Sequence, residues 1–422
     1  MISERAYIWV FLPGHTAPVI CGVVAWDGAE HVFRYGKSYL ARSDAMPLSI
    51  PGRPLGDLTG NPCVLDGELS GALRDAAPDA WGRRLIQREI ARKMDRSAQR
   101  IEGELGEIDY LLGAGPERIG ALDTSETPDV YAPTYRSVSP LEDALMAAEK
   151  MERGEVLDEA LDAALNHGTS IGGARPKVLF SQKNASQEDE YWVAKFSTSR
   201  DTVNLVAAEG GAMKLAARVG LRVADVQVLQ VSNKDVLLVR RFDREPHGSG
   251  EVTRRHMLSA MTLLGLDEYA VRAGDSSYLE LADLLRKYAR NFDQDGPELF
   301  MRMVFNILIG NTDDHARNHA CFWDGDFLEL TPAYDICPQP RLGYSADLAM
   351  VVGDNGRAAR LSNALSQAQR FGLTHDVAAE QVDKMRRWVD ADWKETFAAA
   401  GMKSGDIEYL AKATILSPSI FD

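Results

Sequence analysis

Residues 310–320 read GNTDDHARNHA, a polar stretch that holds two aspartates, two asparagines, two histidines and an arginine. The preceding residues 299–309, LFMRMVFNILI, have the apolar spacing of a buried helix. The residues that follow predict two short strands joined by a tight turn at WDGD, residues 323–326, and then Asp335. The polar stretch is therefore predicted to be a loop between a core helix and a hairpin, a place where a rigid scaffold displays reactive side chains.

Composition limits the class of protein. The chain has 422 residues, 45% of them hydrophobic, which is enough for a large core and for two or three domains. The apolar run Ala6–Leu12 is too short to span a membrane and lacks the flanks of a signal peptide. The four cysteines form no C-x-x-C pair, which is typical of a reducing compartment, so a cytoplasmic location is expected.

Charge argues against nucleic-acid binding by the chain alone. The formal net charge is -15, and a chain this acidic is repelled by phosphate backbones unless it carries a local basic face. The densest basic run, Arg83–Arg100, contains acids of its own and is interpreted as a solvated helix face.

Local patterns predict three regions. The first 60 residues alternate short apolar runs with Gly, Pro and Asp and predict a small, mostly β unit, and a helix is expected after Pro78-Asp79. Residues Thr124–Pro140 are rich in proline and serine and are interpreted as the main linker, followed by one amphipathic helix from Leu141 to about Asn166. The expected regions are 1–139, mixed and β-rich; 140–251, a lobe that binds ATP; and 252–422, mostly helical.

Three segments supply what phosphoryl transfer requires, which is mainly to hold phosphates and magnesium and to position a nucleophile. The first is HGTSIGGARPK, residues 167–177. Its glycines, Gly168, Gly172 and Gly173, allow backbone N–H groups to approach phosphate oxygens, and Arg175 and Lys177 add positive charge. Taken alone, a glycine-rich loop of this kind is more often an ordinary turn.

The second segment is YWVAKF, residues 191–196, a predicted strand with Lys195 inside an apolar run. Such a lysine is usually an exposed residue with its ammonium group in water. In a kinase lobe, however, a strand lysine contacts the nucleotide phosphates and is oriented by a glutamate of the next helix. Glu209 lies on the predicted helix that follows, although the paired glycines beside it are poor helix formers.

The third segment is the polar loop itself. Asp313 and Asn318 have the five-residue spacing that separates the proton-accepting aspartate of a kinase catalytic loop from its magnesium-binding asparagine. Asp335 follows the predicted hairpin, as the second magnesium aspartate of a kinase does. Carboxylate and amide oxygens are the ligands that Mg²⁺ prefers.

Together, these motifs resemble the HipA-type toxin serine/threonine kinases of bacterial toxin–antitoxin modules. The similarity lies in TSIGGARPK, the strand lysine, FNILIGNTDDHARNHA and LTPAYDICP, and extends to Leu73–Ile86, Val239–Arg244 and His256–Gly265. It therefore covers most of the chain from about residue 70 and implies an α+β, protein-kinase-like fold.

The resemblance also implies a site, with ATP and Mg²⁺ as cofactors. Asp313 would be the catalytic proton acceptor, Asn318 and Asp335 would hold magnesium, and Glu209 would orient Lys195. Ser170 would be autophosphorylated, which adds about -1.5 to -2 charges in the glycine-rich loop and switches the kinase off. The residues expected to bind the nucleotide are Ser170, Ile171, Gly172, Gly173, Ala174, Lys177, Lys195, the hinge residues Arg240, Arg241 and Phe242, and also His315 and Asn318.

The partners are likewise implied by the resemblance alone. They are a small HipB-like helix-turn-helix antitoxin and a protein substrate of the aminoacyl-tRNA synthetase class, with DNA contacted only through the antitoxin and no membrane contact.

The loop departs from ordinary protein kinases at two points. The histidine of H-R-D is absent, and D-F-G is replaced by Asp335-Ile-Cys. The favoured interpretation of His315 is a hydrogen bond that braces the loop, and Asp314 is expected to be structural or a backbone cap.

Two other functions stay open from the residues. His315 and His319 lie four apart, as metal-binding histidines on a helix do, and could build a hydrolytic metal centre with Asp313 and Asp335. The glutamate of the zinc-protease motif is absent, however, and such an enzyme would leave Lys195 without a role. The other alternative is a catalytically silent, kinase-like interaction or repressor module.

Overall fold

The computed structural model describes residues 3–65, 69, 71–94, 103–133, 139–165, 168–169, 175–184, 189–198, 201–248 and 250–422. The chain divides into two compact units that are discontinuous in sequence. The first comprises Met1–Thr198, Arg240–Leu258 and Trp323–Gly325. The second comprises Ser199–Val239, Ser259–Phe322 and Asp326–Asp422. The boundaries expected at residues 139 and 251 stay a prediction.

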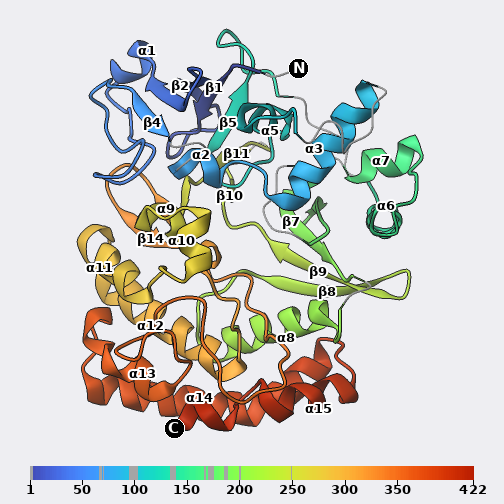
Figure 1. Ribbon diagram of the computed structural model, residues 1–422, viewed down its shortest axis with the longest axis vertical. Helices are drawn as coiled ribbons and strands as arrows, with labels where there is room; N and C mark the ends of the chain where they lie inside the picture. The colour runs from blue at the N-terminus through green and yellow to red at the C-terminus, as the bar shows by residue number, and fades with distance from the viewer. Residues whose placement is uncertain are drawn as a thin grey trace. The chain divides into compact units, whose positions relative to one another are not determined.

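The first unit begins with a five-stranded antiparallel sheet in the order β4-β3-β2-β1-β5 (Figure 1). Its strands are β1 (Arg5–Val10), β2 (Val19–Trp26), β3 (His31–Tyr35), β4 (Cys63–Leu65) and β5 (Leu122–Ser125). Apolar side chains such as Ile8, Val24 and Phe33 are buried along it, which confirms the mostly β unit predicted for the first 60 residues. The short helices are α1 (Lys37–Leu40), α2 (Gly71–Asp75) and α5 (Glu107–Gly113), and α5 contacts β1 and β5.

Helix α3 (Ala80–Lys93) starts after Asp79, as predicted. The single helix expected from Leu141 to about Asn166 is wrong, because the structure has α6 (Leu141–Glu152) and α7 (Glu159–Leu165) there. Gly154 separates them with φ +72°, a left-handed conformation that ends a helix and that glycine adopts without a steric penalty. The apolar spacing continues across the break, so periodicity alone does not reveal it.

The predicted linker is also shorter than expected at its start. Thr124 and Ser125 belong to β5, and Tyr131 donates a hydrogen bond from its hydroxyl to the Asp123 carboxylate at 2.6 Å. The Tyr131 ring contacts Trp9 and Phe11, with ring centroids 5.4 and 5.9 Å apart. The Tyr131 ring therefore anchors this stretch to the sheet. The proline content of the stretch gives no indication of this contact.

Two hairpins complete the first unit. The strands β6 (Lys177–Lys183) and β7 (Asp189–Phe196) pair antiparallel, as do β10 (Arg244–Pro246) and β11 (Val252–Arg254). The short strand β12 (Met257–Ser259) lies at the boundary between the units.

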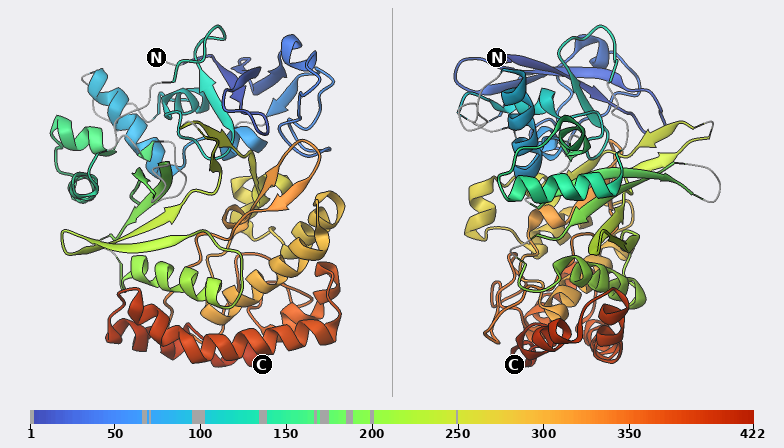
Figure 2. Two further views of the ribbon diagram at one scale, coloured as in Figure 1. Left: turned by 180° about the vertical axis from the view of Figure 1, so that it is seen from behind. Right: turned by 90° about the vertical axis from the view of Figure 1, so that its right-hand side faces the viewer.

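The second unit is mostly helical. Its helices are α8 (Leu205–Arg218), α9 (Ala260–Leu264), α10 (Glu268–Ala273), α11 (Tyr278–Tyr288), α12 (Phe292–Ile309), α13 (Leu361–Ser366), α14 (His375–Ala399) and α15 (Ser404–Ala413). Its strands are β8 (Val226–Val231), β9 (Lys234–Arg240) except for its last residue, β13 (Ala320–Trp323) except for its last residue, and β14 (Leu328–Leu330). Strands β8 and β9 form a hairpin. Helix α14 contacts α8, α12 and α13 and runs the length of this unit (Figure 2). None of the helices described is long and apolar enough to cross a membrane.

Candidate active site

The polar loop begins where helix α12 ends. Residues Met303 to Ile309 of α12 are buried, as the apolar spacing predicts. Gly310 caps the helix with φ +71°, in the left-handed region that glycine adopts readily, and the chain leaves the helix there. A short 3₁₀ turn, Ala316–Asn318, and then β13 follow. The expected arrangement of helix, loop and hairpin is confirmed.

Local hydrogen bonds bring the two ends of the predicted catalytic loop together. The Asn318 backbone N–H donates to the His315 carbonyl at 2.8 Å, and the Asn318 side-chain amide donates to the Asp313 carbonyl at 3.2 Å. The side-chain amide nitrogen of Asn318 thus donates within the loop, and its side-chain oxygen is the atom that can act as an acceptor or a ligand. A spacing of five residues in sequence becomes a closed loop.

Asp313, His315 and Asp335 form an electrostatic group. The pKa of the Asp313 carboxyl is raised above its ordinary value, mainly because neighbouring atoms remove part of its hydration. His315 opposes this rise, and the Asp335 carboxylate adds to it. Asp335 itself has φ +59°, and such strain in a residue other than glycine is concentrated at functional sites.

The adjacent Asp314 faces the protein interior instead of solvent. It is 2% exposed and accepts a hydrogen bond from the Tyr278 hydroxyl and another from His319 Nε2 at 2.8 Å. The brace expected of His315 is therefore made by His319, and the Nδ1 atom of His315 is buried with no hydrogen-bond partner among the described residues. Asp314 has the structural position expected of it.

This geometry disfavours the metal-hydrolase interpretation. His319 is 3% exposed and its Nε2 atom is engaged by Asp314, so it does not form a ligand pair with His315. Within the described part of the chain, no group of three or more His, Cys, Asp and Glu side chains is arranged to hold a metal ion.

The residues Asn318 and Asp335 nevertheless fit a magnesium ion that is shared with a nucleotide. One amide oxygen and one carboxylate are hard donors, and magnesium in phosphoryl-transfer sites takes few protein ligands because phosphates and water supply the rest. A cluster of three acidic or histidine ligands is therefore not required.

In the first unit, Lys177 and Lys195 are directly paired residues on the adjacent strands β6 and β7. The glycine-rich loop leads into this hairpin, but Ser170, Ile171, Gly172, Gly173 and Ala174 lie outside the described residues. Gly168 is described, and a Cβ atom there would lie 2.5 Å from the Lys177 carbonyl and 2.8 Å from Trp81 Nε1. Glycine is required at this position because the backbone approaches its neighbours too closely for a side chain.

The expected hinge residues differ in their surroundings. Arg240 pairs with Glu190 at 3.3 Å, and the Arg241 backbone N–H donates to the Tyr191 carbonyl at 2.8 Å. The Arg241 side chain is buried and pairs with Asp243 at 2.8 Å. Its guanidinium group is therefore occupied within the first unit. Sequence reasoning missed Asp243, although VRRFDR, with three arginines around one aspartate, is a visible signal for a buried ion pair.

Glu209, the expected partner of Lys195, lies in the second unit on α8 and is buried. Close packing explains why two glycines follow it. A Cβ atom on Gly211 would lie 2.9 Å from the Phe397 ring of α14, and one on Gly210 would overlap the Val228 side chain of β8. The helix expected around Glu209 is confirmed, and close packing, not helix propensity, accounts for its glycines.

Comparison with known proteins supports the resemblance stated from the motifs. A curated relative named "Serine/threonine-protein kinase toxin HipA", from Shewanella oneidensis, is 30% identical over 167 residues, which are 36% of this chain and 38% of that protein. A relative named "Putative kinase Y4mE", from Sinorhizobium fredii, is 30% identical over 131 residues, 30% of this chain and 31% of that protein. The matched region thus spans about a third of the length of these relatives.

A likeness over the whole chain appears in the fold. A chain of the solved complex of HipA, HipB and operator DNA from Shewanella oneidensis MR-1 has a TM-score of 0.67 at 19% identity. The likeness covers 96% of this chain and 94% of that one. The α+β, kinase-like fold of the HipA type is confirmed. The family described as HipA-like C-terminal domain matches residues 169–393, more than half of the 422 residues, and the chain therefore belongs to that family.

Proposed function

We propose that the protein is an ATP- and magnesium-dependent serine/threonine protein kinase. The observation that carries this proposal is the closed loop of Asp313 and Asn318, next to the strained Asp335, in a member of the HipA-like family. A relative named as a serine/threonine-protein kinase toxin supports the same activity. The metal-hydrolase alternative has no such support.

Each residue has a defined task in the proposed reaction. Asp313 accepts the proton of the acceptor hydroxyl, and its raised pKa makes it a better base than an ordinary aspartate once it is ionised. Asn318 and Asp335 would hold magnesium, which supplies positive charge that neutralises the phosphates. Lys195 and Lys177, opposite each other on the β6–β7 hairpin, would contact phosphate oxygens, and Arg240–Phe242 would contact the adenine.

The proposal extends to regulation and partners. We infer that Ser170 is the autophosphorylated residue, since it lies between Gly168 and Gly172 in the proposed phosphate loop. The solved complex that shares the fold contains a HipB protein and operator DNA, and on that basis we propose a HipB-like antitoxin as the partner of this chain. An aminoacyl-tRNA synthetase is the proposed substrate class, and inhibition of translation is the proposed outcome.

The test compares phosphate transfer by the wild-type chain and by Asp313→Asn, with radiolabelled ATP and magnesium. Transfer should fall about 10²- to 10⁴-fold, because the general base is lost. Titration calorimetry should show nearly unchanged ATP binding, because Asp313 acts on the acceptor hydroxyl. The matched control, Asp390→Asn on the exposed face of α14, should transfer phosphate at the wild-type rate. Near wild-type transfer by Asp313→Asn would remove Asp313 from the mechanism.

The same samples separate the alternatives. Mass spectrometry after incubation with ATP and magnesium should find one phosphate, on Ser170. A wild-type chain that binds ATP with magnesium but transfers no phosphate to itself or to any protein would indicate the silent interaction module. Zinc binding that is lost on mutation of His315 would revive the hydrolase.

A further inference from the structure

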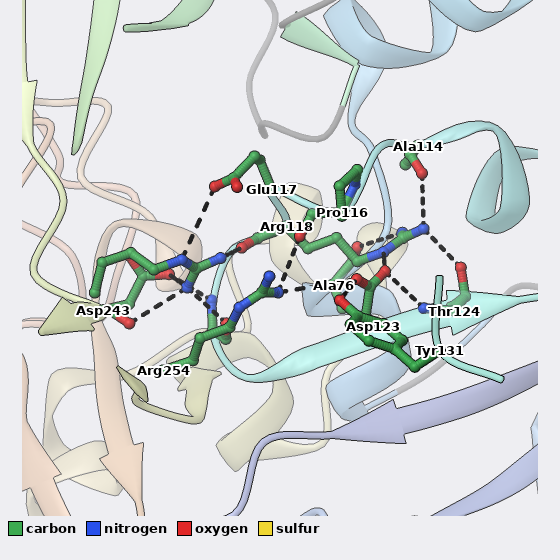
Figure 3. Close-up of polar contacts among 12 residues, drawn as sticks. Ala76, Ala114, Pro116, Glu117, Arg118, Asp123, Thr124, Tyr131, Asp243 and Arg254 are labelled. Carbon is green, nitrogen blue, oxygen red and sulfur yellow. Dashed lines mark hydrogen bonds and ion pairs between the residues drawn. The ribbon is translucent and has the colours of Figure 1, made fainter. Parts of the chain in front are cut away.

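The first unit contains a cluster of charged side chains that is almost closed to water (Figure 3). Its six members are between 0% and 8% exposed, namely Arg118, Asp123, Arg241, Asp243, Arg244 and Arg254. Burial of a charge is costly unless its partners are well placed, so a cluster of this size holds its geometry tightly or does not form.

The cluster joins two segments that lie far apart in sequence. Residues 116–120 supply backbone carbonyls, and residues 241–254 supply arginines. Arg241 donates to the Glu117 and Arg118 carbonyls at 2.9 and 2.6 Å. Arg244 donates to the Arg118 and Gly120 carbonyls at 2.6 and 2.9 Å, and Arg254 to the Pro116 carbonyl at 2.9 Å. The loop 116–120 is therefore held along its whole length.

Asp243 connects two arginines of the second segment with the loop 116–120. Its carboxylate pairs with Arg241 at 2.8 Å and with Arg244 at 2.9 Å, and it accepts the Gly120 backbone N–H at 2.7 Å. Burial alone would raise the pKa of Asp243, but the two arginines and the backbone donor hold it well below its ordinary value. Burial lowers the pKa of Arg244 to about 9, and the Arg241 charge lowers it as well.

The other segment is fixed by a second pair of buried charges. Arg118 pairs with Asp123 at 3.0 Å and donates to the carbonyls of Ala76 and Ala114 at 3.2 and 3.0 Å. Asp123 is part of β5, so this ion pair ties the loop 116–120 to the N-terminal sheet. Figure 3 shows Arg118 reaching from this loop toward Thr124 and Ala114.

The hinge expected at Arg240–Phe242 lies directly beside the cluster. The main chain of Arg241 bonds to Tyr191 on β7, the strand that carries Lys195, while its side chain bonds to the loop 116–120. We propose that the loop 116–120 of the N-terminal region is a positioning element for the nucleotide hinge. This inference rests on the proposed function, because only a kinase uses these residues as an adenine hinge. Through this loop, the N-terminal region would influence the affinity for ATP.

The test uses two variants on the N-terminal side of the cluster, neither of which touches the hinge backbone. Gly120 has φ +77°, and a Cβ atom there would lie 3.2 Å from the Met257 backbone nitrogen, so Gly120→Ala displaces the loop. Glu117→Gln removes the charge that lies 3.4 Å from Arg241. The matched control, Glu107→Gln, breaks a bidentate pair with Arg83 in the same unit.

Three quantities are measured for each variant, namely the melting temperature, the KM for ATP together with kcat, and hydrogen exchange of the amides of residues 240–243. Gly120→Ala should raise KM for ATP roughly three- to tenfold with kcat nearly unchanged. A displaced hinge weakens the binding of ATP equally in the ground state and in the transition state. Glu117→Gln should have a smaller effect in the same direction. Exchange at residues 240–243 should be faster in both variants than in the wild type, and unchanged in Glu107→Gln.

The outcomes separate the two proposals. If the wild type binds ATP, and Gly120→Ala binds it equally well with unchanged exchange at the hinge, the positioning role is refuted while the kinase stands. If all three variants raise KM in proportion to their loss of melting temperature, the cluster is only structural, and the inference also fails. If the wild type binds no ATP in the presence of magnesium, the kinase proposal and the positioning role both fail.

Discussion

Asp314 is the residue that connects the polar loop 310–320 to the core of the second unit. A carboxylate that is 2% exposed must be satisfied by donors from the fold, and Tyr278 and His319 provide them. The Tyr278 ring also contacts the His319 ring edge-on, with centroids 5.3 Å apart. Because Asp314 is adjacent to Asp313, this network fixes the backbone from which Asp313 projects.

We expect Tyr278→Phe to lower the free energy of unfolding by about 1–3 kcal/mol, since the buried carboxylate loses a donor that water cannot replace. Phosphate transfer should fall as well, with KM for ATP little changed, because the loop that carries Asp313 is less well held. Chemical denaturation and steady-state kinetics measure the two effects. Tyr269→Phe, at a residue that is 80% exposed in the same unit, is the control and should alter neither. Unchanged stability in Tyr278→Phe would argue against the network.

The sequence could indicate some of these residues and not others. The proposed site residues Asp313, Asn318 and Asp335 can be proposed from spacing alone, because a catalytic loop is a local motif and its chemistry restricts the residue types. The bond between Tyr278 and Asp314 joins residues 36 positions apart, and only the packing of α11 against α12 brings them together. His315 and His319 look alike in sequence, and only the structure shows that His319 is buried and bonded to Asp314.

Helix α8 illustrates the same limit at the scale of an element. Its paired glycines look like weak points in a helix, whereas the structure uses them to bring α8 close to α14 and β8. The apolar spacing predicts the helix, but not the close approach, which depends on side chains almost 190 residues away, such as Phe397. The break between α6 and α7 escapes prediction for the opposite reason, because the apolar spacing continues through it.

Gly211→Ala should therefore destabilise the protein, although alanine is the better helix former by about 1 kcal/mol. The added methyl would meet the Phe397 ring at 2.9 Å, and such overpacking typically costs about 1–3 kcal/mol. Gly405→Ala is the matched control, because it lies in α15 with open space at its Cβ position. It should raise the melting temperature slightly. If both substitutions stabilised the protein, α8 would not be packed as described.

At the scale of the whole molecule, acid stability should depend on Asp243. Its folded pKa lies below its ordinary value of 3.8, so the stability that it contributes is complete above about pH 4 and is lost as the pH falls further. At neutral pH, Asp243→Asn should lower the free energy of unfolding by about 3–5 kcal/mol, because two buried arginines lose their partner. The deficit should shrink as the pH falls from 4 to 3.

Urea denaturation between pH 7 and pH 3 measures this dependence for the wild type and for the variant. Asp390→Asn, an exposed substitution, should stay within about 0.5 kcal/mol of the wild type at every pH. A deficit for Asp243→Asn that stays constant down to pH 3 would mean that the carboxylate is not stabilised by the arginines.

The distribution of charge over the molecule also predicts how the chain behaves toward DNA. The net charge is -15, and the densest basic run lies on and after α3. In the described part of that run, Arg83 pairs with Glu107 at 2.6 Å, Arg88 with Asp162 at 2.7 Å, and Lys93 with Glu89 at 2.9 Å. These three cations are paired within the protein, so each of them contributes little counterion release on DNA binding.

Mobility-shift assays with the purified chain should therefore show no sequence-specific complex at about 150 mM salt, and any weak binding at low salt should disappear as salt is raised. The double variant Glu107→Gln, Asp162→Asn tests the cause, because it frees Arg83 and Arg88 from their partners without adding a base-reading side chain. It should bind DNA more tightly than the wild type at low salt and show no preference among sequences. A specific complex formed by the wild-type chain alone would contradict this account and would require a DNA-reading surface in addition to the proposed antitoxin.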